Sequence, residues 1–127
     1  MALTVRGPPP AALLVDSITE AAKDGRGRVV VSGSHGGLSS GRYALAAAPR
    51  LVVFNDAGVG KDGAGIAALP ALQAEGIAAC TVAHTSARIG DARSTHDDGV
   101  ISHANADAAA LGLTPGSRLR DALAALG

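Results

Sequence analysis

The chain has 127 residues, of which 47% are hydrophobic, and its 11 basic and 11 acidic residues give a formal net charge of zero. This length fits one domain with its own core, and the hydrophobic content argues against disorder. The neutral balance lacks the electrostatic signature of a nucleic-acid-binding protein, so we expect no nucleic-acid partner.

The single cysteine, Cys80, cannot form an internal disulfide, which fits a reducing compartment. No apolar run approaches the roughly 18 residues of a membrane span, and "MALTVRGPPP" at the start lacks the apolar stretch of a secretory signal. We therefore expect a cytoplasmic protein with no membrane partner. With one Phe, one Tyr and no Trp, the core must consist of Ala, Val, Leu and Ile.

In chain order, the first candidate element is "AALLV" at 11–15, either a strand or a lead from "PPP" into the following helix. That helix is expected over 14–25, capped by Asp16 or Ser17 and ending at Gly25. Three apolar runs follow, and their short length favours strands buried on both faces: "RVVVS" at 28–32, "LVVFN" at 51–55 and "IAACTVAH" at 77–84.

The segments between these runs have helical patterns. "LSSGRYALAAAP" at 38–49 offers Ser39 or Ser40 as N-cap and Pro49 as a stop. "GAGIAALPALQAEG" at 63–76 ends at Gly76, a natural position for a glycine after a helix. Pro70 either occupies the first turn of a helix that starts late or kinks one that starts earlier.

Two more helices are expected near the end of the sequence. "DDGVISHANADAAALG" at 97–112 predicts a helix that ends at Gly112. In the last segment, Thr114 is the expected N-cap and Pro115 the first helical residue. The buried stripe of this last helix is expected to contain Leu119, Ala122, Leu123 and Leu126.

Strands that alternate with helices at this spacing predict a single α/β domain over residues 1–127. The expected architecture is a three-layer α/β/α arrangement, Rossmann-like, around a small, mostly parallel sheet of about three to five strands. The pattern does not predict the order of the strands.

Chemically versatile residues follow the three apolar runs, in the loops "SGSHGG", "NDAGVGKDGAG" and "HTSARIGD". The connections that lead into the second and third runs offer only "PR" and "EG". Because ligands of open parallel sheets bind beyond the carboxyl ends of the strands, this asymmetry predicts a binding crevice at that edge.

The first loop combines Ser34, His35, Gly36 and Gly37. The two glycines would let backbone N–H groups approach an anionic oxygen at a helix N-terminus. His35 would serve as general acid or base near neutral pH. The alternative is a tight turn that carries a solvent-exposed histidine.

The second loop places Asn55 and Asp56 at the end of a strand, followed by Lys61. The alternative to a functional role for Lys61 is a solvated surface charge. A phosphate-binding P-loop is excluded because Asn55 stands where its first glycine is required and Asp62 stands where Ser or Thr should follow the lysine. Neither this loop nor the first has a dinucleotide-binding glycine pattern.

The third loop offers His84, Ser86, Arg88 and Asp91. Arg88 suits bidentate recognition of a carboxylate or phosphate. Asp91 either belongs to the ligand site or holds Arg88 in place. The four histidines and "HDD" at 96–98 raise a divalent metal as an alternative, although no HxH or HxxxH pair is present.

One local resemblance concerns "GVISHANADAAALGLTPG", a stretch of about 18 residues. It is similar to the "GGxxSHxAxxARxxGxPxxxG" stretch of the phosphohistidine swivelling domains of phosphoenolpyruvate-utilising enzymes. That resemblance implies a phosphoryl-carrying role for His103. Asp98 replaces the first glycine of the pattern, its arginine is missing, and no flanking strands are predicted here. The bland alternative for His103 is a helix residue that faces solvent or the crevice rim.

Together the three loops favour a small enzyme of hydrolase, lyase or isomerase type that acts on a small anionic metabolite, a carboxylate or phosphate. The alternatives are a non-catalytic small-molecule-binding or regulatory module and an oligomeric subunit of a larger enzyme. No cofactor is predicted, and the Ala-rich surface favours a homo-oligomer. The expected catalytic residues are His35, Asp56, Lys61 and His84, and the expected substrate-binding residues are Ser34, Gly36, Gly37, Asn55, Ser86, Arg88, Asp91 and His103.

Overall fold

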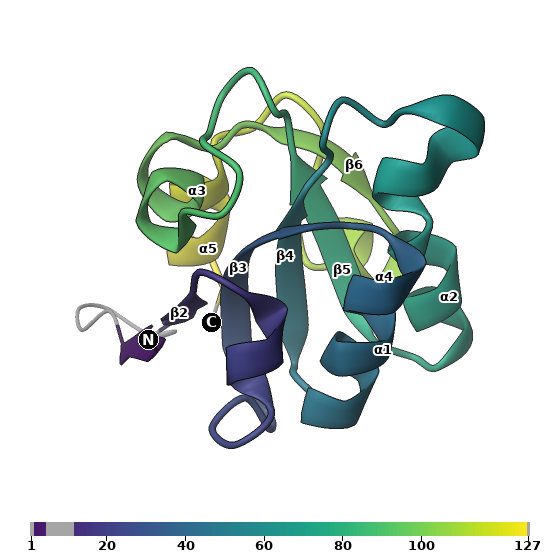
Figure 1. Ribbon diagram of the computed structural model, residues 1–127. Coiled ribbons are helices and arrows are strands. Elements are labelled where there is room, and N and C mark those ends of the chain that lie inside the picture. Colours follow the sequence, from purple (N-terminus) through teal and green to yellow (C-terminus); the bar gives the residue numbers. More distant parts are fainter. Residues whose placement is uncertain (1, 5–11, 127) are drawn as a thin grey trace.

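A mostly parallel sheet forms the centre of the computed structural model, which describes residues 2–4 and 12–126 (Figure 1). Its strands lie side by side in chain order, β1 to β6. The pairs between β2, β3, β4 and β5 are parallel, whereas β1 and β6 add antiparallel edges. The bounds are β1 (Ala2–Thr4), β2 (Ala12–Val15), β3 (Val29–His35), β4 (Leu51–Asn55), β5 (Ala78–Val82) and β6 (Ile101–Ala104). The predicted Rossmann-like α/β class is confirmed.

Helices cover both faces of the sheet (Figure 1). The crossovers between the parallel strands place three elements on one face: η1 (Ile18–Ala21), α1 (Leu38–Ala47) and α2 (Ala68–Ala74). Neighbouring strands joined in sequence by crossovers of one hand must keep those crossovers on one side. After β5 the chain turns to the opposite face, where it forms α3 (Ala92–Asp98), α4 (Ala106–Ala110) and α5 (Leu119–Ala124).

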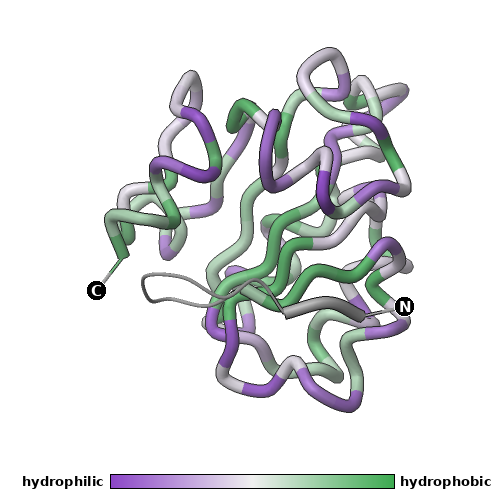
Figure 2. The backbone as a smooth tube through the Cα atoms, turned by 90° about the vertical axis from the view of Figure 1, so that its left-hand side faces the viewer, coloured by the Kyte–Doolittle hydropathy of each residue, from purple (hydrophilic) through white to green (hydrophobic). Residues whose placement is uncertain are grey.

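The period of two along the strands divides the core into two layers. In β4, Val52 and Phe54 pack toward α1 and α2, whereas Leu51 and Val53 pack toward α3 and α5. Figure 2 shows the strands as the most hydrophobic part of the chain, with hydrophilic segments in the loops. Cys80 is fully buried in the second layer, and burial raises the pKa of its thiol to about 12, so it is a core residue as expected.

Several predicted helix boundaries are confirmed and others are wrong. Ser17 caps η1 through a capping box, although this helix is a short 3₁₀ turn. The N-cap of α1 is Gly37 rather than Ser39 or Ser40, because the extended backbone of Gly37 lets the helix start directly after the first loop. Pro70 lies in the first turn of α2, which confirms the late start. The strand predicted at 11–15 is confirmed over Ala12–Val15; residue 11 and "PPP" lie outside the described residues.

The segment 97–112 differs most from its prediction. Its first two residues end α3, its middle is strand β6, paired with β5, and Ala106–Ala110 forms the short helix α4. Asn105 separates the two because its Oδ1 accepts hydrogen bonds from Ala79 N at 3.1 Å and Ala108 N at 3.0 Å. The last helix begins at Leu119 after Arg118, not at Thr114 and Pro115. Its predicted stripe is confirmed: Leu119, Ala122, Leu123 and Leu126 are all buried.

Candidate functional site

The loops after β3, β4 and β5 emerge at one edge of the sheet because these strands are parallel. The chain turns toward α1 and α2 after β3 and β4, but toward α3 after β5 (Figure 1). Loops of neighbouring strands that diverge to opposite faces leave a crevice between them. Asp56 directly follows β4, and His84 comes two residues after the end of β5. These two residues therefore lie where the two loops diverge.

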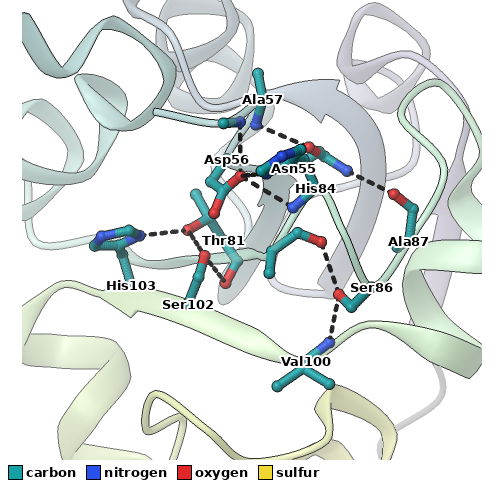
Figure 3. A network of polar contacts seen from close by, with 12 residues as sticks. Asn55, Asp56, Ala57, Thr81, His84, Ser86, Ala87, Val100, Ser102 and His103 are labelled. Carbon is teal, nitrogen blue, oxygen red and sulfur yellow. Dashed lines mark hydrogen bonds and ion pairs between the residues drawn. The ribbon is translucent and has the colours of Figure 1, made fainter. Parts of the chain in front are cut away.

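Asp56 is the centre of a network of polar contacts between these two loops (Figure 3). It is only 5% exposed. Its Oδ1 accepts hydrogen bonds from the backbone N–H of Gly58 at 2.8 Å and of His84 at 3.0 Å. The same oxygen lies 3.3 Å from Nδ1 of the His84 ring. One carboxylate therefore ties the loop after β4 to the loop after β5 and holds the imidazole.

Burial raises the pKa of Asp56, but hydrogen bonds from the Gly58 backbone, the Ser102 side chain and both the backbone and ring of His84 together lower it below its usual value. Asp56 is thus an anion at neutral pH. In the neutral ring of His84, the geometry places the proton on Nδ1, facing this carboxylate, and the lone pair on Nε2. A carboxylate beside Nδ1 orients the ring and leaves Nε2 to accept a proton, which is the arrangement found in histidine general bases.

The His84 side chain is 55% exposed, so the imidazole is accessible to a ligand. Its ring lies over Gly58, where an added Cβ would be 3.7 Å from the ring, and Gly58 has a φ of +77°. That left-handed conformation favours glycine. The loop after β4 therefore packs against the ring through backbone alone.

A second set of polar contacts continues from Asp56 along β5 and β6 (Figure 3). Thr81 Oγ1 lies 2.9 Å from Ser102 Oγ and 3.5 Å from Nδ1 of His103. Ser102 in turn hydrogen-bonds Asp56. His103 is therefore a residue of strand β6 next to the site, not a helix residue. Ser102, which precedes it, lies on the same strand. Thr81 and Ser102 were not predicted as site residues, because the partner of each lies on another strand. The local indication of strand β6 was the segment "GVIS" before His103, which contains two β-branched residues.

An open pocket of about 740 Å³ begins at His84 and extends to α3. We call it the arginine pocket, since Arg88 and Arg93 line it together with Asp91, Asp97 and Asp98. Asp91 accepts a hydrogen bond from Ser94 N at 2.9 Å and so caps α3. Among the described residues no ion pair joins Asp91 to Arg88, so capping, not holding Arg88, is its structural role. Arg93 was missed because α3 was not predicted.

His35 has different surroundings. Its Nδ1 accepts a hydrogen bond from Gly37 N at 3.0 Å and lies 3.4 Å from Ser40 Oγ. The proton of the neutral ring therefore sits on Nε2. His35 lines a second pocket of about 550 Å³, which we call the apolar pocket. Its residues are His35, Gly37, Leu38, Ala57, Val59, Gly60, Ala64, Gly65, Ala67 and Ile89.

The anion-binding role predicted for Gly36 and Gly37 gains no support from their backbone contacts and stays a prediction. Gly36 N–H donates to Asn55 O at 3.0 Å, and Gly37 N–H donates to His35. Both donors are therefore satisfied within the protein. What Gly36 provides is space, because a Cβ there would lie 2.6 Å from Gly65 O.

Three other residues that were predicted to bind substrate form hydrogen bonds that hold backbone groups in place. Asn55 is fully buried; its Nδ2 donates to Ala87 O at 3.2 Å and its Oδ1 accepts from Ala57 N at 2.8 Å. Ser86 Oγ donates to Ala83 O and accepts from Val100 N. Ser34 Oγ accepts from Ile18 N. Their predicted contacts with substrate remain predictions.

Lys61 is exposed at the start of η2 (Lys61–Ile66). In the part of the chain that the structure describes, its side chain forms no ion pair. It lines neither of the two pockets. The structure therefore does not bring Lys61 together with His84 and Asp56, and its predicted catalytic role has no geometric support.

Within the described residues, no group of three or more His, Cys, Asp and Glu side chains is arranged to hold a metal ion. None of the described helices has both the length and the apolar character needed to cross a membrane. Comparisons of the chain with protein-family models, with curated proteins and with solved structures gave no match.

Proposed function

We propose that the protein is a small enzyme of hydrolase, lyase or isomerase type that uses His84 as a general base on a small anionic metabolite. The observation that carries this proposal is the His84–Asp56 pair at the wall of a pocket that contains two arginines. An oriented, accessible imidazole beside cationic side chains combines proton transfer with anion binding.

Each residue has a defined role in the proposed reaction. His84 Nε2 takes a proton from the substrate or from an attacking water, and Asp56 balances the imidazolium charge that results. Arg88 and Arg93 hold the carboxylate or phosphate of the substrate. Ser102 and the backbone N–H groups of Gly58 and His84 keep Asp56 ionised. None of these steps requires a cofactor.

A homo-oligomer remains part of the proposal. Leu38, Tyr43 and Leu45 of α1 are 55%, 50% and 42% exposed. Exposed apolar side chains grouped on one helix are typical of surfaces that associate. The mass of the protein in solution, measured by light scattering over a range of concentrations, tests this.

Activity is best sought by incubating the purified protein with a mixture of small carboxylates and phosphate esters and following their loss by mass spectrometry. His84→Gln should abolish the loss of the compound that the natural protein consumes. Arg88→Ala should raise the KM for it, whereas Arg120→Ala on α5 is the matched arginine control and should change nothing. All three variants should keep the unfolding temperature of the natural chain.

The alternative is a non-catalytic binding or regulatory module that uses the same pocket. Its signature would be a compound that raises the unfolding temperature of the natural protein but is never converted. Such a compound, bound equally well by the His84→Gln variant and unconverted by both, would contradict the enzymatic proposal.

A further inference from the structure

The apolar pocket differs from the arginine pocket in what lines it. Apart from His35, every residue of this pocket of about 550 Å³ is glycine or has an apolar side chain. Ligand sites typically combine a mainly apolar lining with a few polar groups that orient the ligand. The Nε2–H group of His35 is the polar group of this kind here.

The pocket is shaped by close backbone packing. A Cβ on Gly65 would collide with the carbonyl oxygen of Asp56, so no side chain can fill the space at that point. Val59 has a φ of +66°, which is a strained conformation for a β-branched residue. Strain of this kind persists only where surrounding contacts impose it, and here Asp56 O accepts from Val59 N at 2.7 Å.

The two pockets share one wall. Arg88 lines the arginine pocket and its neighbour Ile89 lines the apolar pocket. On the other strand loop, Gly58 lies under the His84 ring, between Ala57 and Val59 of the apolar pocket. A hydrogen bond of 2.7 Å from Gly90 N to Gly33 O holds the 88–90 segment against β3. His84 thus lines the arginine pocket directly and adjoins the apolar pocket through Gly58, whose chain neighbours line it.

The rim of the apolar pocket exposes large apolar side chains. Leu38 at the start of α1 is 55% exposed, and Ile89 in the loop after β5 is 52% exposed. A ligand that removes such apolar surface from water gains binding free energy from its burial. Because only His35 offers a polar side chain there, a purely ionic metabolite would leave this surface uncovered.

We propose that the substrate has two parts: an anionic group that Arg88 and Arg93 bind, and an apolar aliphatic or aromatic body that the apolar pocket binds beside His35. The reacting atoms then lie at the shared wall, within reach of His84. His35 donates its Nε2 proton to a polar atom of the apolar body and so positions it. This inference rests on the proposed function and specifies the substrate class.

Matched probes separate the two parts: phosphate against phenyl phosphate, acetate against phenylacetate, and phenol as an apolar probe without the anion. Backbone amide NMR shifts report binding at each pocket. We expect each phenyl-bearing anion to bind at least about tenfold more tightly than its simple anion, since an apolar ring is buried. It should shift the amides of Val59, Ala64 and Ile89 together with those of Arg88 and Arg93.

Ile89→Ser should remove most of that tenfold gain while leaving the affinity for phosphate or acetate unchanged. Leu45→Ser is the matched control, because Leu45 is an exposed leucine of α1 outside both pockets. It removes an apolar side chain from the proposed association surface only, so it should preserve the gain. Equal affinity for the simple and phenyl-bearing anions, with both arginine amides shifted, would contradict the two-part substrate alone. Absence of binding by every anion, with phenol still bound, would contradict the anion site of the proposed function and the two-part substrate with it.

Discussion

His35 ends β3 and His84 comes shortly after β5, so both histidines lie at the same edge of the sheet. The Nδ1 atoms of the two rings have opposite hydrogen-bonding roles. His84 Nδ1 faces the carboxylate of Asp56, so its free Nε2 is a proton acceptor. His35 Nδ1 accepts a backbone N–H from Gly37, so its free Nε2 is a proton donor. The chemistry that a histidine offers is thus determined by the partner of its other nitrogen.

The surroundings of the two rings differ in the same sense. His84 opens to a pocket with two arginines and three aspartates, whereas His35 opens to one lined by glycine and apolar side chains. One region suits proton transfer next to an ionic group, and the other suits positioning of an apolar group. In the proposed function, His84 is therefore the base and His35 the positioning group.

The largest expected effect is on catalysis. Replacing His84 by Gln should lower kcat about 10²- to 10⁴-fold, the usual contribution of a general base. His35→Gln should instead raise KM, with kcat changed less than about tenfold, because a positioning donor is lost rather than the base. Steady-state kinetics on the substrate found by metabolite depletion measures both. Equal losses of kcat in the two variants would contradict the division of roles.

Gly65→Ala should lower the free energy of unfolding by about 3 kcal/mol, the upper range for overpacking a tight site. The reason is that the new Cβ collides with the Asp56 backbone, which joins the two regions. Urea unfolding measures the loss. Gly27→Ala is the control: Gly27 has a φ of +70° and open space around it, so backbone strain alone should cost about 1 kcal/mol there.

Asp56→Asn should lower stability near neutral pH by about 1–2 kcal/mol, since charge-assisted hydrogen bonds become neutral ones. The pKa of Asp56 is lowered in the folded state. Its contribution is therefore fully present above the usual carboxyl pKa and is lost as pH falls through the lower folded value. Urea unfolding at a series of pH values should show the two proteins converging in acid. A difference that does not change with pH would show that the charge of Asp56 contributes nothing.

The smallest expected effect concerns the strained wall between the two pockets. Val59→Gly should raise the free energy of unfolding by up to about 1 kcal/mol, because glycine adopts a positive φ without strain. The apolar pocket also loses part of its lining, so affinity for phenyl phosphate should fall while that for phosphate stays the same. Thermal unfolding and the NMR titrations measure the two effects. A destabilised variant would mean that packing of the valine outweighs its strain.

The fold was largely predictable because the buried strands are continuous apolar runs. The runs that contain Val30, Val52 and Cys80 became β3, β4 and β5, and the loops after them meet at one edge as expected. Strand β6 and helix α3 were not predicted, since Ser102 and His103 interrupt one pattern and the polar "ARSTHDD" has a weak apolar stripe. The helix boundaries depended on local caps that several residues could have supplied.

The sequence predicted which residues belong to the site, but not which of them contact one another. Asp56 and His84 were both named, but their pairing joins residues far apart in sequence and follows from the register of β4 and β5. Lys61 lies apart from the pair because it stands at the start of η2 and lines neither pocket. Spacing in the sequence contains no information on which nitrogen of His35 is occupied, because its partner is a backbone N–H of a turn.

The chain-order arrangement of the strands has a consequence for folding during synthesis. Each parallel strand can join the sheet as soon as its crossover is made, so contacts on the α1 and α2 face form between near neighbours. The other face has no cover until α3 and α5 are synthesised. A nascent chain that ends near residue 90 therefore presents Val31, Val53 and Cys80 as an open apolar sheet face. During this interval the nascent chain is an aggregation-prone intermediate that a chaperone would bind. A protein truncated near residue 90 would expose the same apolar face.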